Sequence, residues 1–145
     1  MNQLKNYPEI IKLLNRKIWT KKRFEEKLIK KDFLQNEIES IVIQAQQLGL
    51  INDDKWTKIF LSKKNTHIKS NREIKQFLLK EGISREIIDK NIDERNDHEA
   101  CMRAMEYKKK RIPEKKQEKK KILYNYLSSR GFSSESIYGL LKIEQ

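Results

Sequence analysis

The feature that most constrains this chain is an internal repeat, because a repeating sequence must fold into similar units that stack on one another. A shift of 50 residues lays the segment 20–42 over 70–92 without a gap. A further shift of 49 brings the C-terminal segment into the same register. The aligned positions include Leu123 with Ile74, Leu127 with Leu78, Gly131 with Gly82 and Ser133 with Ser84. The offsets predict three copies of one structural unit.

Helix signals recur at the matched positions of the copies. Phe24 and Leu28 are four residues apart, which places both on one face of a helix. Thr20 and Ser70 precede the equivalent helices of the first two copies, where their hydroxyls can cap the helix. Glu73 follows Ser70 by three residues and completes the pattern of a capping box.

The turn that follows each of these helices also repeats. Gly82 and Gly131 stand where a left-handed residue ends the helix, and Asp32 takes that position less favourably in the first copy. Ser84 then caps the third helix of its copy. Leu34 occupies the equivalent place in the first copy and has no capping atom, so we expect its helix to begin a residue or two later or to fray.

Another helix precedes each of these pairs, which makes three helices per copy. We predict these first helices at Pro8–Lys17, at Asp53–Thr66 and roughly at His98–Lys110. Ile11 and Leu14, and secondarily Ile10 and Leu13, should face inward in the first of them. Trp19 and Trp56 have apolar neighbours at helical spacing and should fill cores, and Pro113 should interrupt the third copy.

Composition agrees with helices joined by short turns. The 145 residues include only four glycines and two prolines, and no strand-like alternation of apolar and polar residues is sustained. We therefore predict an all-α fold of three tandem three-helix repeats, stacked into an elongated, curved array. The repeats should span residues 1–51, 52–96 and 97–145.

Charge is strongly positive and unevenly distributed. The formal net charge is +12, from 33 basic against 21 acidic residues. Residues 103–121 hold ten basic and three acidic residues, whereas residues 81–99 hold seven acidic and three basic. An AT-rich genome would explain the preference for lysine over arginine, but it would not explain this clustering. The segregation favours a polyanionic partner, either nucleic acid or an acidic protein face.

The basic turns supply the candidate binding residues. They are Lys21, Lys22 and Arg23 in the first copy; Lys63, Lys64, Lys69 and Arg72 in the second; and Lys108, Lys109, Lys110 and Arg111 in the third. Further lysines at 115, 116, 119, 120 and 121 follow Pro113. Since the repeats superpose, the basic turns should line up along one side of the array. For any single residue, a merely solvated side chain is an equally good interpretation.

The sequence lacks the residue patterns of metal sites, phosphate-binding loops and catalytic centres. His67 and His98 lie in different copies, and His98 with Cys101 makes only two of the ligands that zinc requires. Cys101 is best read as a core residue, and the four scattered glycines exclude a phosphate-binding loop. We predict no catalytic centre, no metal and no cofactor. Without a signal peptide or an apolar run of membrane length, we expect a cytoplasmic protein, monomeric and without a membrane contact.

Several segments together resemble one bacterial family. They are the run Gly49-Leu50-Ile51-Asn52-Asp53-Asp54-Lys55-Trp56, the helix end Leu78-Leu79-Lys80-Glu81-Gly82-Ile83, the segment Thr20-Lys21-Lys22-Arg23 and the closing motif Leu127-Ser128-Ser129-Arg130-Gly131-Phe132-Ser133. In order and spacing they resemble the RecX family, regulators of the RecA recombinase, over essentially the whole chain. Lys63 and Lys64 stand in a stretch that is usually richer in arginine, which keeps the charge but loses the planar guanidinium fork.

The resemblance implies a function by binding. A RecX-like regulator would lie along the RecA–DNA filament, contact neighbouring protomers and DNA phosphates, and inhibit RecA ATP hydrolysis, strand exchange and co-protease activity. It would act in homologous recombination, DNA repair and the SOS response. Lys63, Lys64 and Arg72 would be the central contacts. The alternatives from charge alone are an autonomous nucleic-acid-binding protein and a helical scaffold whose charge serves solubility.

Overall fold

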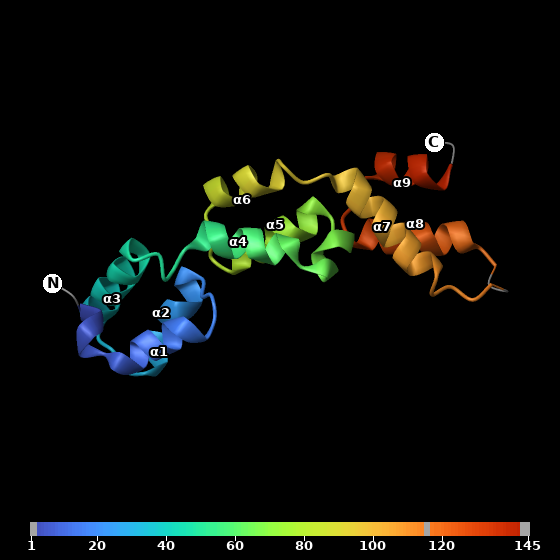
Figure 1. The fold of residues 1–145 in the computed structure, drawn as a ribbon. Helices are drawn as coiled ribbons and strands as arrows, with labels where there is room; N and C mark the ends of the chain where they lie inside the picture. The colour runs from blue at the N-terminus through green and yellow to red at the C-terminus, as the bar shows by residue number, and fades with distance from the viewer. Residues whose placement is uncertain (1–2, 115–116, 143–145) are drawn as a thin grey trace.

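The computed structural model describes residues 3–114 and 117–142, and in them the chain is helical. Figure 1 shows three groups of helices in an elongated row, with the two termini at opposite ends. Within the described residues the one β-type contact is an isolated parallel bridge between Trp19 and Ile51. The fold class predicted from the repeat is therefore confirmed as all-α.

Each group, called a unit from here on, contains three α-helices. Unit one holds α1 (Pro8–Arg16), α2 (Lys21–Lys30) and α3 (Gln35–Gln47) after a short 3-10 helix, η1 (Gln3–Asn6). Unit two holds α4 (Asp53–Ser62), the 3-10 helix η2 (Lys64–Ile68), α5 (Asn71–Lys80) and α6 (Arg85–Ile92). Unit three holds α7 (Asp97–Lys109), α8 (Lys119–Ser129) and α9 (Ser134–Leu141).

Every unit has its own small hydrophobic core. The matched positions of the repeat are buried in all three: Phe24 and Leu28, Ile74 and Leu78, and Leu123 and Leu127. Ile68 of η2 packs against the core of unit three, so the units are not independent. The boundaries 1–51, 52–96 and 97–145 fall between these cores, and we retain them as a proposal.

Caps and turns follow the repeat. The side chains of Thr20, Ser70, Ser84 and Ser133 each accept a hydrogen bond from the backbone amide three residues ahead. The three turn residues all have a left-handed backbone, with φ of 64° at Asp32, 80° at Gly82 and 88° at Gly131. The register deduced from sequence is thus the register of the helix ends.

One expected helix start was wrong, and one expected capping box is formed only in part. Helix α3 begins at Gln35, directly after Leu34, because the Glu37 carboxylate accepts a hydrogen bond from the Leu34 amide at 3.0 Å. Half of a capping box is enough to hold that end. In the predicted box at Ser70, Glu73 instead directs its carboxylate to Arg130 of unit three. A long-range ion pair has replaced the local bond.

Two further details differ. The predicted helix Asp53–Thr66 stops at Ser62, because the Thr66 hydroxyl donates to the carbonyls of Leu61 and Lys63 and draws the chain into η2. In α1 it is Ile10 that is fully buried, whereas Ile11 is 37% exposed. Helices α1 and α7 otherwise end within one residue of prediction, and Pro113 lies in the break between α7 and α8.

The helices are short relative to a lipid bilayer. Among the described residues, no helix is both long enough and apolar enough to cross a membrane.

Candidate functional site

The first junction, between units one and two, joins the start of α2 to the end of α5. The Arg23 guanidinium donates from Nε and Nη2 to both carboxylate oxygens of Glu81, at 2.8 and 2.6 Å. Beside it, Lys22 Nζ donates to the Lys80 carbonyl at 2.7 Å. Glu81 is only 6% exposed, and its hydrogen bonds from Arg23 hold the pKa of its carboxyl below the usual range. Paired with a cation, the buried carboxylate stays charged.

The second junction, between units two and three, uses the same positions with the charges exchanged. The repeat offsets place Glu73 over Arg23 and Arg130 over Glu81. Arg130 Nη1 lies 3.1 Å from Glu73 Oε1, and the Ser70 hydroxyl donates to the Arg130 carbonyl. One geometry therefore joins all three units, with the arginine first on the N-terminal side and then on the C-terminal side.

A glycine lets the backbones approach at each junction. A Cβ on Gly82 would lie 2.9 Å from Lys22 Cβ, and a Cβ on Gly131 would lie 2.8 Å from Ser70 Oγ. Arg72 borders Gly131 as Lys22 borders Gly82. The glycines predicted for their left-handed backbone thus also provide the space into which side chains of the preceding unit pack.

An aspartate ties the units together a second time. Asp53 accepts a hydrogen bond from the Lys21 amide at 2.9 Å, and Asp97 accepts one from the Asn71 amide at 2.7 Å. Lys21 and Asn71 are equivalent first residues of their helices, so each aspartate caps a helix of the preceding unit.

The neighbours of Asp53 have structural roles of their own. Asn52 caps α4 by accepting from the Lys55 amide, and Asp54 accepts from Asn91 Nδ2 at 2.9 Å. Asp54 also pairs with Lys58 and Lys90, at 2.7 and 3.2 Å. Three polar residues of the motif at 49–56, namely Asn52, Asp53 and Asp54, therefore each make contacts that stabilise the fold.

Three of the candidate basic residues have side chains that take part in these junctions. Lys22, Arg23 and Arg72 contact the next unit, although the Arg23 side chain remains 60% exposed. Lys108 Nζ lies 5.4 Å from the Tyr126 ring centroid, within its own unit. The other candidates on the described chain are exposed or, at Lys69, half-buried: Lys21, Lys63, Lys64, Lys69, Lys109, Lys110 and Arg111. The lysines at 115 and 116 lie outside the described residues.

The fold brings one group of candidates together from two units. Lys64 of η2 lines a shallow hollow with Lys110 and Arg111 from the end of α7. Tyr107 lies in the same wall, and the Arg111 guanidinium stacks 3.6 Å above its ring centroid. We call these four residues the basic platform. Cations beside an aromatic ring suit a phosphate or a carboxylate partner.

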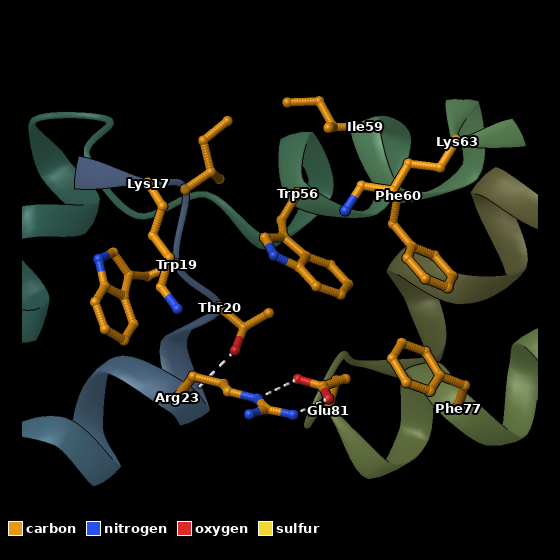
Figure 2. Close-up of a pocket in the computed structure, with 11 residues that line it drawn as sticks. Lys17, Trp19, Thr20, Arg23, Trp56, Ile59, Phe60, Lys63, Phe77 and Glu81 are labelled. Carbon is orange, nitrogen blue, oxygen red and sulfur yellow. Dashed lines mark hydrogen bonds and ion pairs between the residues drawn. The ribbon is translucent and has the colours of Figure 1, made fainter. Parts of the chain in front are cut away.

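A deeper hollow of about 470 Å³ opens at the first junction, and sequence reasoning did not predict it. Figure 2 shows Trp56, Phe60 and Phe77 side by side along one wall, Trp19 on the opposite side, and the Arg23–Glu81 pair at the base. We call it the junction hollow. Its remaining lining residues are Lys17, Ile18, Thr20, Ile59 and Lys63.

The aromatic wall is a continuous stack. The ring centroids of Trp56 and Phe60 are 5.4 Å apart with planes 6° apart, and those of Phe60 and Phe77 are 4.9 Å apart with planes 15° apart. Trp56 and Phe60 are four residues apart in α4, so the sequence indicated two of the three rings as part of an apolar helix face. Phe77 belongs to α5 and lies off the buried face of that helix, so only the tertiary arrangement shows that it joins them.

Two further observations concern metal ligands and the single cysteine. Within the described residues, no three histidine, cysteine or acidic side chains gather as metal ligands. Cys101 is fully buried, and burial raises the pKa of its thiol to about 11, far from the range of a reactive cysteine.

Known proteins resemble the chain over most of its length. No family model matches it. It is 32% identical over 134 residues to "Regulatory protein RecX" of Caldanaerobacter subterraneus subsp. tengcongensis, which covers 91% of this chain and 66% of that protein. It is 30% identical over 138 residues to the protein of the same name from Clostridium beijerinckii, covering 91% and 64%. The chain thus spans about two thirds of the length of these two relatives.

Two solved structures share the fold. A crystal structure of regulatory protein RecX matches with a TM-score of 0.77 and 21% identity, over 98% of this chain and 72% of that one. A crystal structure of RecX from Lactobacillus salivarius matches with a TM-score of 0.75 and 21% identity, over 97% and 94%.

Proposed function

Because the chain belongs to the RecX family of regulatory proteins, we propose that it binds the RecA–DNA filament and restrains RecA activity. The similarity to proteins named regulatory protein RecX, over about nine tenths of the chain, carries this proposal. The activities restrained would be ATP hydrolysis, strand exchange and co-protease function. We propose that the chain acts as a cytoplasmic monomer and has no catalytic activity of its own.

The shape and charge of the molecule support this mode of binding. Three units in a row present cations over a long path, and the net charge is +12. A filament offers a matching path of acidic protein grooves and DNA phosphates. A ligand that contacts several protomers and prefers one filament conformation shifts the filament toward that conformation. Regulation then needs binding energy alone.

The candidate contact residues differ in how far their side chains are exposed and available to a partner. Lys63 and Lys64 are exposed at the start of η2, and Lys64 belongs to the basic platform with Lys110 and Arg111. We propose these as the central contacts. The candidates at or beside the junctions would contribute through their exposed portions: Lys21, Lys22, Arg23, Lys69 and Arg72. Lys108 and Lys109 would extend the platform along α7.

A titration of the protein into RecA assembled on single-stranded DNA tests the proposal through the rate of ATP hydrolysis. We expect inhibition at stoichiometric protein, and weaker inhibition by the Lys63→Glu/Lys64→Glu variant. Lys30→Glu/Lys31→Glu is the matched control, since it reverses two adjacent exposed lysines outside the candidate set. No effect of the unmodified protein on hydrolysis would refute the proposal. An equal loss in both variants would remove Lys63 and Lys64 from the contact surface.

The basic platform favours one other function, autonomous binding of nucleic acid. That function predicts tight binding to bare DNA, with an affinity that falls steeply as salt rises. Binding to bare single-stranded DNA is therefore measured in parallel, at the same salt. If it is as tight as binding to the filament and accounts for the inhibition by competition, the nucleic-acid-binding function is correct and the filament proposal is wrong.

A further inference from the structure

We propose that the junction hollow receives a large apolar side chain carried by an acidic segment of a partner protein. The inference does not depend on the identity of that partner, so it stands apart from the RecA proposal. It rests on three properties of the hollow: exposed apolar walls, cations without carboxylate partners at its rim, and a carboxylate at its base whose two oxygens are already paired.

The walls expose apolar surface that the fold itself does not use. Ile18, Ile59 and Phe77 are each 39% exposed, and they come from three separate segments of two units. Single exposed apolar residues are ordinary, but three that converge on one hollow are not. Trp56 and Phe60 extend the same wall. A concave apolar surface of this kind gains free energy when an apolar group fills it.

The rim is positively charged. Lys17 and Lys63 both line the hollow, and within residues 3–114 and 117–142 neither forms an ion pair with a carboxylate. The Lys17 ammonium lies instead over the Trp19 ring, 4.2 Å from its centroid. Arg23 and Glu81 neutralise one another at the base. The free charge around the opening is positive, which fits carboxylates on either side of the inserted side chain.

A nucleobase fits the hollow less well. A base stacks best on free aromatic faces, whereas the three rings of this wall already stack on one another. A base also needs partners for its polar edge, because unpaired buried polar groups are costly. The Thr20 hydroxyl accepts from the Arg23 amide, and both Glu81 oxygens accept from the Arg23 guanidinium. Both carboxylate oxygens at the base thus already have a partner, so they are not free to pair with the amino groups of a base.

Tryptophan fluorescence provides a direct test, because both tryptophans of the chain, Trp19 and Trp56, line the hollow. The probe is a short synthetic peptide of Glu and Ser with one central Leu. Its titration should change the emission of the unmodified protein saturably. The same peptide with Ser in place of Leu, and a Gln/Ser peptide that keeps the Leu, should each bind about tenfold more weakly.

Variants assign the binding to the hollow. Ile59→Ser and Phe77→Ser should each weaken binding of the acidic Leu peptide about tenfold, whereas Ile29→Ser, at a residue 58% exposed in unit one, should not. Helical content is checked for each variant by circular dichroism. Equal binding by the Leu and Ser peptides would overturn the proposal. So would displacement of the Leu peptide by a stoichiometric oligothymidylate, which would show that the hollow prefers nucleic acid.

Discussion

Three glycines of this chain share a left-handed backbone but differ in their surroundings. Gly49, Gly82 and Gly131 have φ of 73°, 80° and 88°. A Cβ on Gly49 would meet nothing within 4 Å, whereas one on Gly82 would approach Lys22 Cβ to 2.9 Å. The conformational requirement is therefore common to all three, and the requirement for space arises only at the junctions. The two requirements can be measured separately.

Alanine at these positions should give two different losses of stability. Gly49→Ala should cost about 1 kcal/mol, because only the left-handed backbone disfavours a Cβ there. Gly82→Ala should cost about 2–3 kcal/mol, since the Cβ also forces Lys22 and the unit behind it to shift. Urea unfolding followed by circular dichroism measures both values. Equal losses would show that the first junction has room to yield.

At the scale of elements, the two junctions use the same pair of helix ends with the acidic and basic residues interchanged. Arg23, at the start of α2, faces Glu81 at the end of α5, and Glu73, at the start of α5, faces Arg130 at the end of α8. The same helix-end geometry thus accepts the ion pair in either orientation. Removing Arg23 alone should destabilise the protein, because it leaves the buried Glu81 carboxylate without its partner.

Exchanging the first pair should therefore restore what single changes remove. Arg23→Glu or Glu81→Arg alone should each cost about 1–2 kcal/mol, since each places like charges together at the first junction. The double variant Arg23→Glu/Glu81→Arg reproduces the arrangement of the second junction and should recover most of that loss. A double-mutant cycle in the free energy of unfolding measures the coupling. Additive losses would mean that the pair contributes nothing to docking.

The helices and their ends were predictable from sequence because they depend on local signals. Apolar spacing and caps such as Thr20 and Ser84 act within a few residues, so the repeat register located them. The end of α4 was missed because Thr66 competes for backbone carbonyls, a contest that propensity does not resolve. The junction hollow could not be predicted, since Phe77 joins Trp56 only after two helices pack. The roles of Lys22 and Arg23 as junction residues were hidden for the same reason.

At the scale of the whole molecule, the exchanged charges favour one order of units. If unit three docked on unit one, Arg130 would face Arg23. If unit two docked on a second copy of itself, Glu81 would face Glu73. Both arrangements place like charges together at the junction, where they are unfavourable, and only the native order pairs opposite charges twice. A repeat protein needs specific pairing of this kind, since otherwise its similar units could dock in several orders.

The fixed order matters to the proposed function because a rigid row can contact several protomers of a filament at once. Replacing Glu73 and Glu81 by glutamine loosens both junctions, leaves every candidate cation in place and raises the net charge by two. If binding were only attraction to phosphates, this variant should bind and inhibit more strongly. We expect the opposite: weaker inhibition of RecA ATP hydrolysis, because loosened units pay more entropy to bind together. Inhibition is measured at fixed salt, with unchanged helical content as the control and X-ray scattering to detect the broader range of shapes. Stronger inhibition that rises with the added charge would show that the charge of the molecule governs binding and its shape does not.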